Sequence, residues 1–225
     1  MMRWGRAARL LQAPAGARVL DVGCAFGFGT ARLKRRYRAV GVDASFSLLH
    51  RARGPVRGTL ALARAERLPF ANAAFDAVVC LEVLEHVQAE APVLDEIRRV
   101  LKPRGELVLS VPNLGLLANW DSINVFGRLT GRELSLPLGE PPSGSSRHRH
   151  YRRHDLEQLL TGFVVNRVVF SGSGLAEVAN LVLLAAGSRA YTGLQYLYFA
   201  LAALDDQVLT GRRGYNIMLH ARKTA

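Results

Sequence analysis

The sequence predicts an α/β fold in which helices cover a mostly parallel sheet. In residues 18–30 an apolar run leads into small residues at alternate positions and then into an amphipathic run. We interpret this stretch as a buried strand, a tight turn and the start of a helix. Apolar and amphipathic stretches continue to alternate up to residue 112, as in a chain of strand–helix units. The length of 225 residues suits one such domain with a sizeable core.

The turn after this first strand is expected to hold a small molecule. Gly23, Ala25 and Gly27 carry little or no side chain, so a ligand can approach the backbone closely. A dinucleotide fingerprint would need glycine at positions 25 and 28, where the chain has Ala25 and Phe28. A phosphate-binding loop that ends in Gly-Lys-Ser/Thr is missing from the sequence as well. The turn therefore disfavours NAD, FAD and a loop of the P-loop type.

The segment from Asp21 to Gly27 resembles the first motif of the class I S-adenosylmethionine-dependent methyltransferases, in which acidic-x-Gly-x-Gly-x-Gly follows the first strand. The resemblance is to type 11-like members, such as methyltransferases of the ubiquinone and menaquinone pathways. It covers nearly all of residues 17–112 and, less specifically, 150–171 and 214–223. One departure is Ala25, where the family usually has its middle glycine. A methyl group is harmless there only where φ is negative, and we expect it to be tolerated.

This resemblance implies a Rossmann-like sheet of seven strands, with helices on both faces and an antiparallel last strand. It also implies one methyltransferase domain, 1–225, that binds S-adenosylmethionine. We expect the cofactor-binding core at 17–112, a lid insertion over the substrate at 113–150, and an apolar helical insertion at 174–210, between strands six and seven. A short basic helix at 2–11 is expected to cover the cofactor edge.

A carboxylate closes the second expected strand, Ala39–Asp43, twenty residues after Gly23. Such a group can accept two hydrogen bonds from a ribose diol and so fix an adenosine. Asp43 could also serve as the N-cap of the next expected helix, 46–53. Its spacing from Gly23 favours the ribose role, which is compatible with capping.

The third expected strand, 57–63, leads into a loop that resembles the family's adenine-edge loop, commonly Asp-Ala-Glu-x-Leu-Pro-Phe. Here Arg64 replaces the aspartate that usually accepts a hydrogen bond from the adenine amino group, and a guanidinium cannot accept one. The resemblance therefore leaves the adenine contact to backbone groups near Ala65 and Glu66.

Glu82, Glu85 and His86 follow the fourth expected strand, 75–81. At helical spacing they would share one face and direct two carboxylates and an imidazole at the cofactor pocket. Three roles are open: packing around the cofactor, as in many family members; proton transfer at the methyl acceptor; or binding of a divalent cation, as in the ubiquinone-pathway O-methyltransferases. We assign His86 and Glu85 as catalytic residues and assign no metal, because the sequence offers no fourth protein ligand.

The motif positions and the resemblance together give the expected cofactor contacts. These are Asp21, Gly23, Cys24, Ala25, Gly27, Asp43, Ala44, Ala65, Glu66, Leu81 and Glu82. Cys24 and Cys80 are expected to be small buried residues with reduced thiols, because residues 1–18 contain no cleavable secretion signal.

The rest of the chain completes the expected sheet. A helix at 88–101 precedes the fifth strand at 106–112, and the last two strands are expected at 162–170 and 215–222. Neither Asn/Asp-Pro-Pro-Tyr/Phe after the fourth strand nor a Pro-Cys nucleophile is present. Methylation of DNA bases is therefore disfavoured.

Basic residues outnumber acidic ones by 30 to 18, which gives a formal charge of +12. A polyanion, an acidic substrate and an anionic membrane surface are all physically reasonable partners. Arginines and histidines crowd in 147–154, which could bind a phosphate or carboxylate or form an exposed basic loop. No aromatic-rich RNA-binding signature accompanies these residues.

The insertion at 174–210 contains two apolar helical runs, and Arg189 is the only charged residue between 178 and 204. Each run is shorter than the ~20 residues that span a membrane. Both need a partner surface, and a homodimer interface, a hydrophobic substrate tunnel and an interfacial membrane hairpin remain open.

The sequence thus predicts a methyltransferase that transfers a methyl group to a small or lipidic acceptor, at oxygen or carbon. The alternative is a non-catalytic or RNA-directed protein of the same fold with a basic binding surface. The expected location is cytoplasmic, with peripheral contact at the inner membrane face as an open addition.

Overall fold

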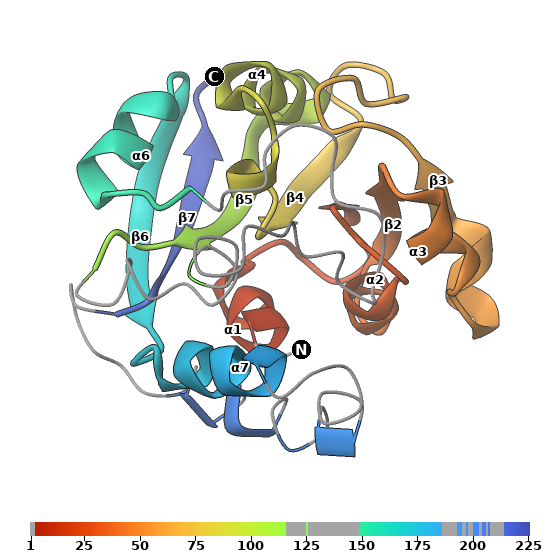
Figure 1. The fold of residues 1–225 in the computed structure, drawn as a ribbon. Coiled ribbons are helices and arrows are strands. Elements are labelled where there is room, and N and C mark those ends of the chain that lie inside the picture. The colour runs from red at the N-terminus through yellow and green to blue at the C-terminus, as the bar shows by residue number, and fades with distance from the viewer. Residues whose placement is uncertain are drawn as a thin grey trace.

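The computed structural model describes residues 3–115, 149–185 and 214–225, together with residues 125, 193–194, 197, 200–202, 204–205 and 207. Seven strands form one sheet in the order β3-β2-β1-β4-β5-β7-β6 (Figure 1). The neighbours from β3 to β5 pair in parallel, and β7 pairs antiparallel with both β5 and β6. The predicted Rossmann-like sheet with an antiparallel last strand is confirmed.

The elements follow one another as alternating strands and helices along the core. The strands are β1 (Arg18–Val22), β2 (Arg38–Asp43), β3 (Leu60–Leu62), β4 (Phe75–Leu81), β5 (Leu101–Pro112), β6 (Phe163–Ser171) and β7 (Asn216–Lys223). The helices are α1 (Arg3–Leu10), α2 (Phe28–Leu33), α3 (Phe46–His50), α4 (Glu90–Val100), α6 (Arg153–Leu159) and α7 (Leu175–Ala185), with 3₁₀ turns η1 (Gly54–Thr59) and η2 (Leu84–His86).

Strand β4 shows why the inner strands have continuous apolar sequences. Its side chains alternate between two hydrophobic clusters: Val78 packs on the side of α4 and α6, and Val79 packs on the side of α1 and α2. Both valines are fully buried. A parallel strand that is covered on both faces is mostly apolar. The exception in β4 is Asp76, which is half-buried near the start of the strand and accepts a hydrogen bond from Lys102. The strand has the predicted bounds of Phe75–Leu81.

Two strands differ by more than one residue from the bounds that the sequence predicts. The third strand is reduced to Leu60–Leu62, because the residues before it form the 3₁₀ turn η1. The fifth begins earlier than predicted, since Leu101 already pairs with Phe75 before a register shift. The lid predicted at 113–150 lies mostly outside the described residues, and the second apolar run of the insertion is described in part.

The parallel strands all point their carboxyl ends at one edge of the sheet. The loops that follow β1, β2, β3 and β4 therefore meet there, which is where ligands bind in open α/β sheets. Strand β6 is antiparallel to β7 and so runs with β5, which places the start of α7 at the same edge (Figure 1).

Candidate functional site

A cavity of about 390 Å³ opens at the carboxyl ends of β1, β2 and β4. Seven of the predicted cofactor contacts line it, as does the predicted catalytic His86: Gly23, Ala25, Asp43, Ala44, Ala65, Glu66 and Glu82. Asp21, Cys24, Gly27 and Leu81 are buried and are not among the lining residues. The structure thus brings together most of the predicted site in one space, with a buried layer beneath it.

Asp43 is the best-anchored carboxylate of the cavity wall. Its Oδ2 accepts a hydrogen bond from the N–H of Ala25 at 2.7 Å, and its Oδ1 accepts one from the N–H of Ser45 at 2.8 Å. The helix α3 is capped by Ser45, whose Oγ accepts from the N–H of Leu48 at 3.3 Å. Asp43 therefore does not cap α3, and its carboxylate joins two loops at the cavity wall.

Ala25 corrects one prediction, because its φ is +49° and not negative. A left-handed conformation costs an alanine about 1–2 kcal/mol relative to the right-handed one. The conformation directs the Ala25 N–H at Asp43. The alanine is thus tolerated at the cost of local strain, which the hydrogen bond to Asp43 helps to offset.

Gly23 is needed for packing within the protein as well as for the close approach of a ligand. A Cβ on Gly23 would lie 2.3 Å from Cγ2 of Val83, and the φ of Gly23 is +74°. Any larger residue would push Val83 off the turn, and Val83 itself lines the cavity. Glycine at this position therefore sets the distance between the turn and the segment after β4.

Asp21 lies beneath the turn as a fully buried carboxyl group. The Thr30 hydroxyl donates to its Oδ2 at 2.6 Å, whereas its Oδ1 has no hydrogen-bond partner among the described residues. Burial, with a smaller contribution from the charge of Asp43, raises the pKa of Asp21 from 3.8 to about 7, although the bond from Thr30 lowers it. A buried carboxyl oxygen without a donor is a position at which a bound cation or proton is stabilised.

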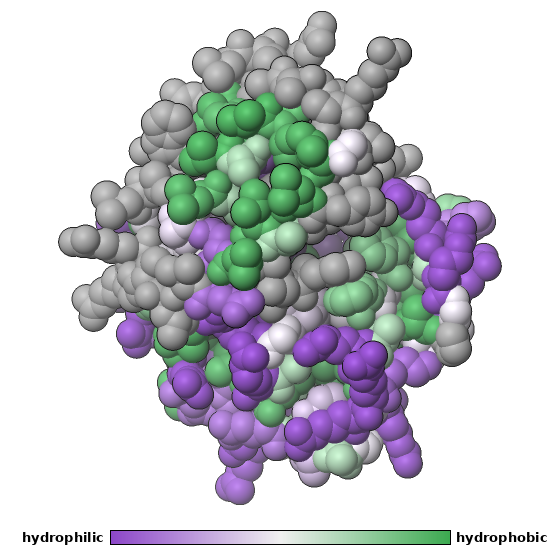
Figure 2. Space-filling model, turned by 90° about the horizontal axis from the view of Figure 1, so that it is seen from below, coloured by the Kyte–Doolittle hydropathy of each residue, from purple (hydrophilic) through white to green (hydrophobic). Residues whose placement is uncertain are grey.

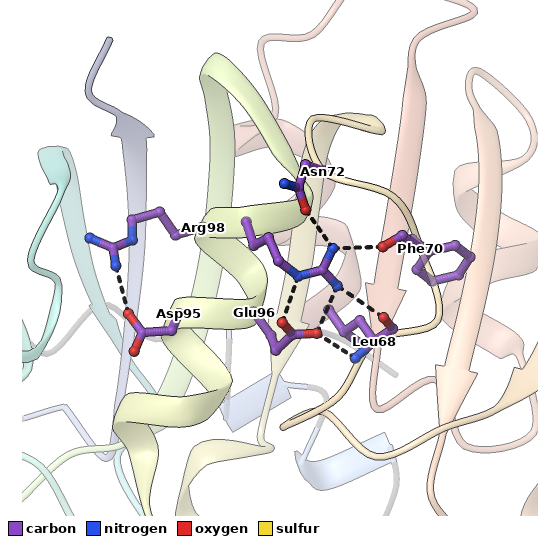
Figure 3. A network of polar contacts seen from close by, with 7 residues as sticks. Leu68, Phe70, Asn72, Asp95, Glu96 and Arg98 are labelled. Atoms are coloured by element: carbon purple, nitrogen blue, oxygen red, sulfur yellow. Dashed lines mark hydrogen bonds and ion pairs between the residues drawn. The ribbon is translucent and has the colours of Figure 1, made fainter.

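The loop at 64–72, which resembles the family's adenine-edge loop, forms a rim of the cavity, and helix α4 holds this rim through hydrogen bonds (Figure 3). The Arg99 guanidinium donates to the carbonyl oxygens of Leu68 and Phe70 at 3.0 and 2.7 Å, and to Oδ1 of Asn72 at 2.9 Å. Glu96 accepts from the Leu68 N–H at 2.6 Å and pairs with Arg99. The hydrogen bonds from Arg99 keep the pKa of Glu96 below its ordinary value, so Glu96 stays charged.

Arg64, which stands where the family usually has an acidic residue, pairs with Glu66 across the rim. Its guanidinium lies 2.9 Å from Oε1 of Glu66, and both residues line the cavity. The rim therefore offers a carboxylate from Glu66, in addition to the backbone groups predicted near Ala65.

The predicted helical face of Glu82, Glu85 and His86 is wrong. Glu82 has a φ of +57°, and a 3₁₀ turn follows it in place of an α-helix. Glu82 and His86 line the cavity, whereas Glu85 is buried beneath the turn, with its Oε1 4.0 Å from Nε2 of His86. In the described part of the chain, no group of three or more His, Cys, Asp or Glu side chains gathers as a metal site would require.

Helix α1 is fastened to the cavity at Glu82. The Arg3 guanidinium forms an ion pair with Oε2 of Glu82 and donates to Oδ1 of Asn216 at 2.8 Å. Glu82 also accepts from the Ser110 hydroxyl at 2.7 Å. The ring of Trp4 fills the space that a side chain on Gly29 would occupy, which packs α1 against α2. The predicted basic helix therefore does lie over this edge of the sheet.

Residues 149–154 lie within the described part of the basic segment 147–154. Arg149 donates to the carbonyl oxygens of Leu84 and Val87, and its Nη1 lies 2.9 Å from Oε1 of Glu90. The Tyr151 hydroxyl donates to the Leu84 carbonyl at 2.9 Å. Arg149 and Tyr151 thus brace the turn that carries His86. Sequence reasoning missed this role because the contacts with Leu84 and Val87 join residues more than sixty positions apart.

The residues of the cavity fit an adenosine-containing cofactor. The carboxylate of Asp43 has the chemistry to accept hydrogen bonds from a ribose, and the rim at Ala65 and Glu66 has polar groups suited to a base. Val42 and Leu48 add apolar surface to the wall. The buried Asp21 lies beneath a turn that could hold a positively charged group. Leu48 was missed by sequence reasoning, although it lies on the short helix that follows the Asp43 loop.

Comparison with known proteins agrees with this fit. Residues 20–109 match the family profile described as a methyltransferase domain. An uncharacterized methyltransferase of Mycobacterium tuberculosis is 33% identical over 166 residues, which cover 68% of this chain and 82% of that protein. A ubiquinone biosynthesis O-methyltransferase of Xanthomonas axonopodis is 37% identical over 107 residues, which cover 44% of this chain and 45% of that protein.

A solved structure shares the fold over nearly the whole chain. It is phosphoethanolamine N-methyltransferase 2 of Haemonchus contortus in complex with S-adenosyl-L-methionine, with a TM-score of 0.65 and 20% identity. The match covers 99% of this chain and 53% of that one. The chain therefore spans about half the length of some of the proteins that it resembles.

Proposed function

The chain belongs to the S-adenosylmethionine-dependent methyltransferases, and we propose that the cavity holds the cofactor beside a methyl acceptor that is deprotonated by His86. The observation that carries this proposal is the shared cavity. It places Gly23, Asp43 and Glu66, from the cofactor motifs, around the same space as His86. Bound S-adenosylmethionine supplies a methyl group already activated by its sulfonium, so the protein must mainly align the acceptor and exclude water.

Asp43 would hold the ribose hydroxyls with the lone pairs that its bonds to Ala25 and Ser45 leave free. The rim at Ala65 and Glu66 would face the adenine, and Arg99 would keep this rim in place. Asp21, in its ionised form, would stabilise the positive end of the cofactor. The proposal is supported by the position of Asp43, Ala65 and Glu66 in the wall of one cavity.

His86 would take up the proton that the acceptor loses as the new bond to carbon forms. Its imidazole lines the cavity, and its side chain is 29% exposed. Glu85 lies beneath it and would act as a positioning residue that stabilises the imidazolium. The acceptor itself is proposed to be small or lipidic and to be methylated at oxygen or carbon, since the exposed apolar side chains near α7 suit a hydrophobic molecule better than a nucleic acid.

Substitution of His86 tests the proton-transfer role. We expect His86→Ala to lower kcat by about 10²–10⁴-fold, the usual contribution of a general base, with little change in the affinity for S-adenosylhomocysteine. His86→Gln is the matched control, because it keeps a hydrogen-bonding side chain but cannot take up a proton near neutral pH. Turnover of a labelled methyl group on lipid, quinone, glycan and RNA fractions would first identify the acceptor pool.

Three results would contradict this assignment. Wild-type turnover in His86→Ala would exclude a base role for His86. Binding of S-adenosylhomocysteine with no methyl transfer to any fraction would favour the alternative, a non-catalytic protein that keeps the cofactor fold. Activity that disappears with a chelator and returns with Mg²⁺ would favour a metal-assisted mechanism over proton transfer by His86 alone.

A further inference from the structure

Two apolar stripes on the insertion point outward. Helix α7 exposes Leu175, Val178 and Val182, which are three and four positions apart and therefore share one face. Leu194, Leu197, Leu201 and Leu204 repeat the same spacing in the helical residues described beyond α7, and all four are exposed. A surface helix of a globular domain normally turns its apolar stripe toward the core. Here both stripes face away from it.

A polar clamp holds the two stripes together, and the name hairpin is used here for α7 with the described residues 193–194, 197, 200–202 and 204–205. Oδ1 of Asp205 accepts from the N–H of Ser173 at 2.9 Å, and its Oδ2 accepts from the N–H of Gly174 at 3.2 Å. The Ser173 hydroxyl also donates to Asp205. The end of the second stripe therefore returns to the start of α7, and hydrophobic side chains gather in one patch on this side of the molecule (Figure 2).

The extent of exposure sets this patch apart from ordinary surface residues. Leu175 is 67% exposed, Val182 is 62% exposed and Leu204 is 63% exposed. Removal of apolar side chains from water is favourable, so a partner that covered these seven side chains would gain stability from the contact. Contiguous apolar patches of this kind mark interaction surfaces.

The charge of the protein selects among the surfaces that could cover this patch. The formal charge is +12, so two copies of the chain repel each other as they approach. A nucleic acid would attract the positive charge of the protein but would not remove the exposed leucines from water. A membrane of anionic phospholipids attracts the positive charge and accepts the apolar side chains together. No helix within the described residues is long and apolar enough to cross a bilayer.

We propose that the hairpin is a peripheral membrane-binding element that inserts its exposed leucines and valines into an anionic lipid surface. The start of α7 lies at the sheet edge that also carries the cofactor cavity. Docking through the hairpin therefore brings the cavity edge of the sheet close to the lipid, where an apolar molecule can be collected.

Vesicle flotation with the full chain tests this proposal. We expect wild-type protein to float with vesicles of phosphatidylcholine and phosphatidylglycerol, to float less with phosphatidylcholine alone, and to be released in part by added salt. Val182→Glu should lower the partition coefficient for the anionic vesicles at least ~10-fold, because it places a charge in the inserted face. Leu201→Glu should have the same effect from the second stripe.

Val164→Glu is the matched control for both variants. Val164 is an exposed valine of β6, outside the hairpin, and its replacement changes the net charge by the same amount as Val182→Glu. It should float like the wild type. Circular dichroism and the thermal midpoint would show that all three variants are folded.

Three outcomes would overturn the proposal. One is wild-type protein that ignores anionic vesicles. Another is equal flotation of Val182→Glu and Val164→Glu, which would mean that the charge alone binds the membrane. The third is a concentration-dependent doubling of mass in light scattering that Val182→Glu abolishes, since this would assign the patch to a second copy of the chain.

Discussion

Asp43 and Asp205 stabilise two different regions of the molecule by the same local means. Each carboxylate accepts hydrogen bonds from two backbone N–H groups: those of Ala25 and Ser45 at the cofactor cavity, and those of Ser173 and Gly174 at the hairpin. What surrounds the two carboxylates differs. Asp43 lines a concave space together with polar side chains, whereas Asp205 clamps a segment that exposes leucines.

This difference indicates that the two regions suit different kinds of binding partner. The cavity carries its polar groups in fixed positions and needs a small ligand of matching shape. The hairpin is fixed at its base by Asp205, and its outer face exposes leucines and valines. Such a face suits a lipid surface, which does not require shape complementarity. A change in one region should therefore leave the function of the other intact, and this independence can be measured.

The largest expected effect is that of Asp43→Ala on cofactor binding. The affinity for S-adenosylhomocysteine should fall at least ~100-fold, because two charge-assisted hydrogen bonds contribute about 1.5–3 kcal/mol each. Calorimetry on the purified variant measures this change. Asp205→Ala is the matched control, which should bind the ligand as the wild type does. An unchanged affinity in folded Asp43→Ala would refute the ribose role.

The second prediction concerns the buried Asp21 and the pH dependence of stability. Its pKa of about 7 in the folded chain lies above its ordinary value of 3.8, so the folded state binds the proton more tightly. The stability that this proton contributes is present at low pH and is lost as the pH rises toward 7, by up to about 1.4 kcal/mol per pH unit. Asp21→Asn should remove this loss.

Urea unfolding of the ligand-free protein between about pH 5 and pH 8 checks this expectation. The variant should lose less stability than the wild type over this range and should be the more stable protein at the upper end. If wild type and Asp21→Asn show parallel pH profiles, the buried carboxyl group is not the source of the pH dependence.

A smaller and more local effect is expected for Asp205→Ala. Loss of the clamp should destabilise the hairpin by about 1–2 kcal/mol, the usual effect of removing a side chain that caps a helix. Hydrogen exchange should therefore quicken at the amides of α7 while the amides of β1 and β4 keep their protection. Quicker exchange throughout the sheet would mean that the two regions are not independent.

The smallest effect is that of Ala25→Gly. Relief of the left-handed strain is worth about 1–2 kcal/mol, and the added backbone freedom of glycine in the unfolded chain offsets about 0.4–1 kcal/mol of it. We expect a net stabilisation of about 0.5–1 kcal/mol, measured by urea unfolding. A destabilised Ala25→Gly would show that the alanine methyl group makes a packing contact that outweighs the strain.

The sequence predicted those parts of the fold that depend on local pattern. The strand Phe75–Leu81 was predicted with the bounds that the structure shows, because a strand buried on both faces has a run of apolar residues, here Ala77–Leu81. The family resemblance located Asp43 and the rim because their motifs are contiguous. These features explain why the cavity, more than the hairpin, could be located before the structure was known.

The failures concern residues whose conformation is set by distant contacts. Glu82 has the spacing of a helix with Glu85 and His86, yet its left-handed backbone turns Glu85 away from the cavity. Its partners Arg3 and Ser110 lie far away in the sequence. The positive φ of Ala25 is likewise set by the carboxylate of Asp43, and no local pattern reports it.

The attachment of the rim to α4 has a consequence for protein engineering. Arg99 and Glu96 hold the rim mainly through backbone carbonyl and N–H groups of Leu68 and Phe70, and these groups remain whatever side chains the loop carries. The loop positions that face the cavity, such as Arg64 and Ala65, can therefore be exchanged without releasing the loop. A library of substitutions at these two positions is a direct route to variants that accept S-adenosylmethionine analogues with an altered base.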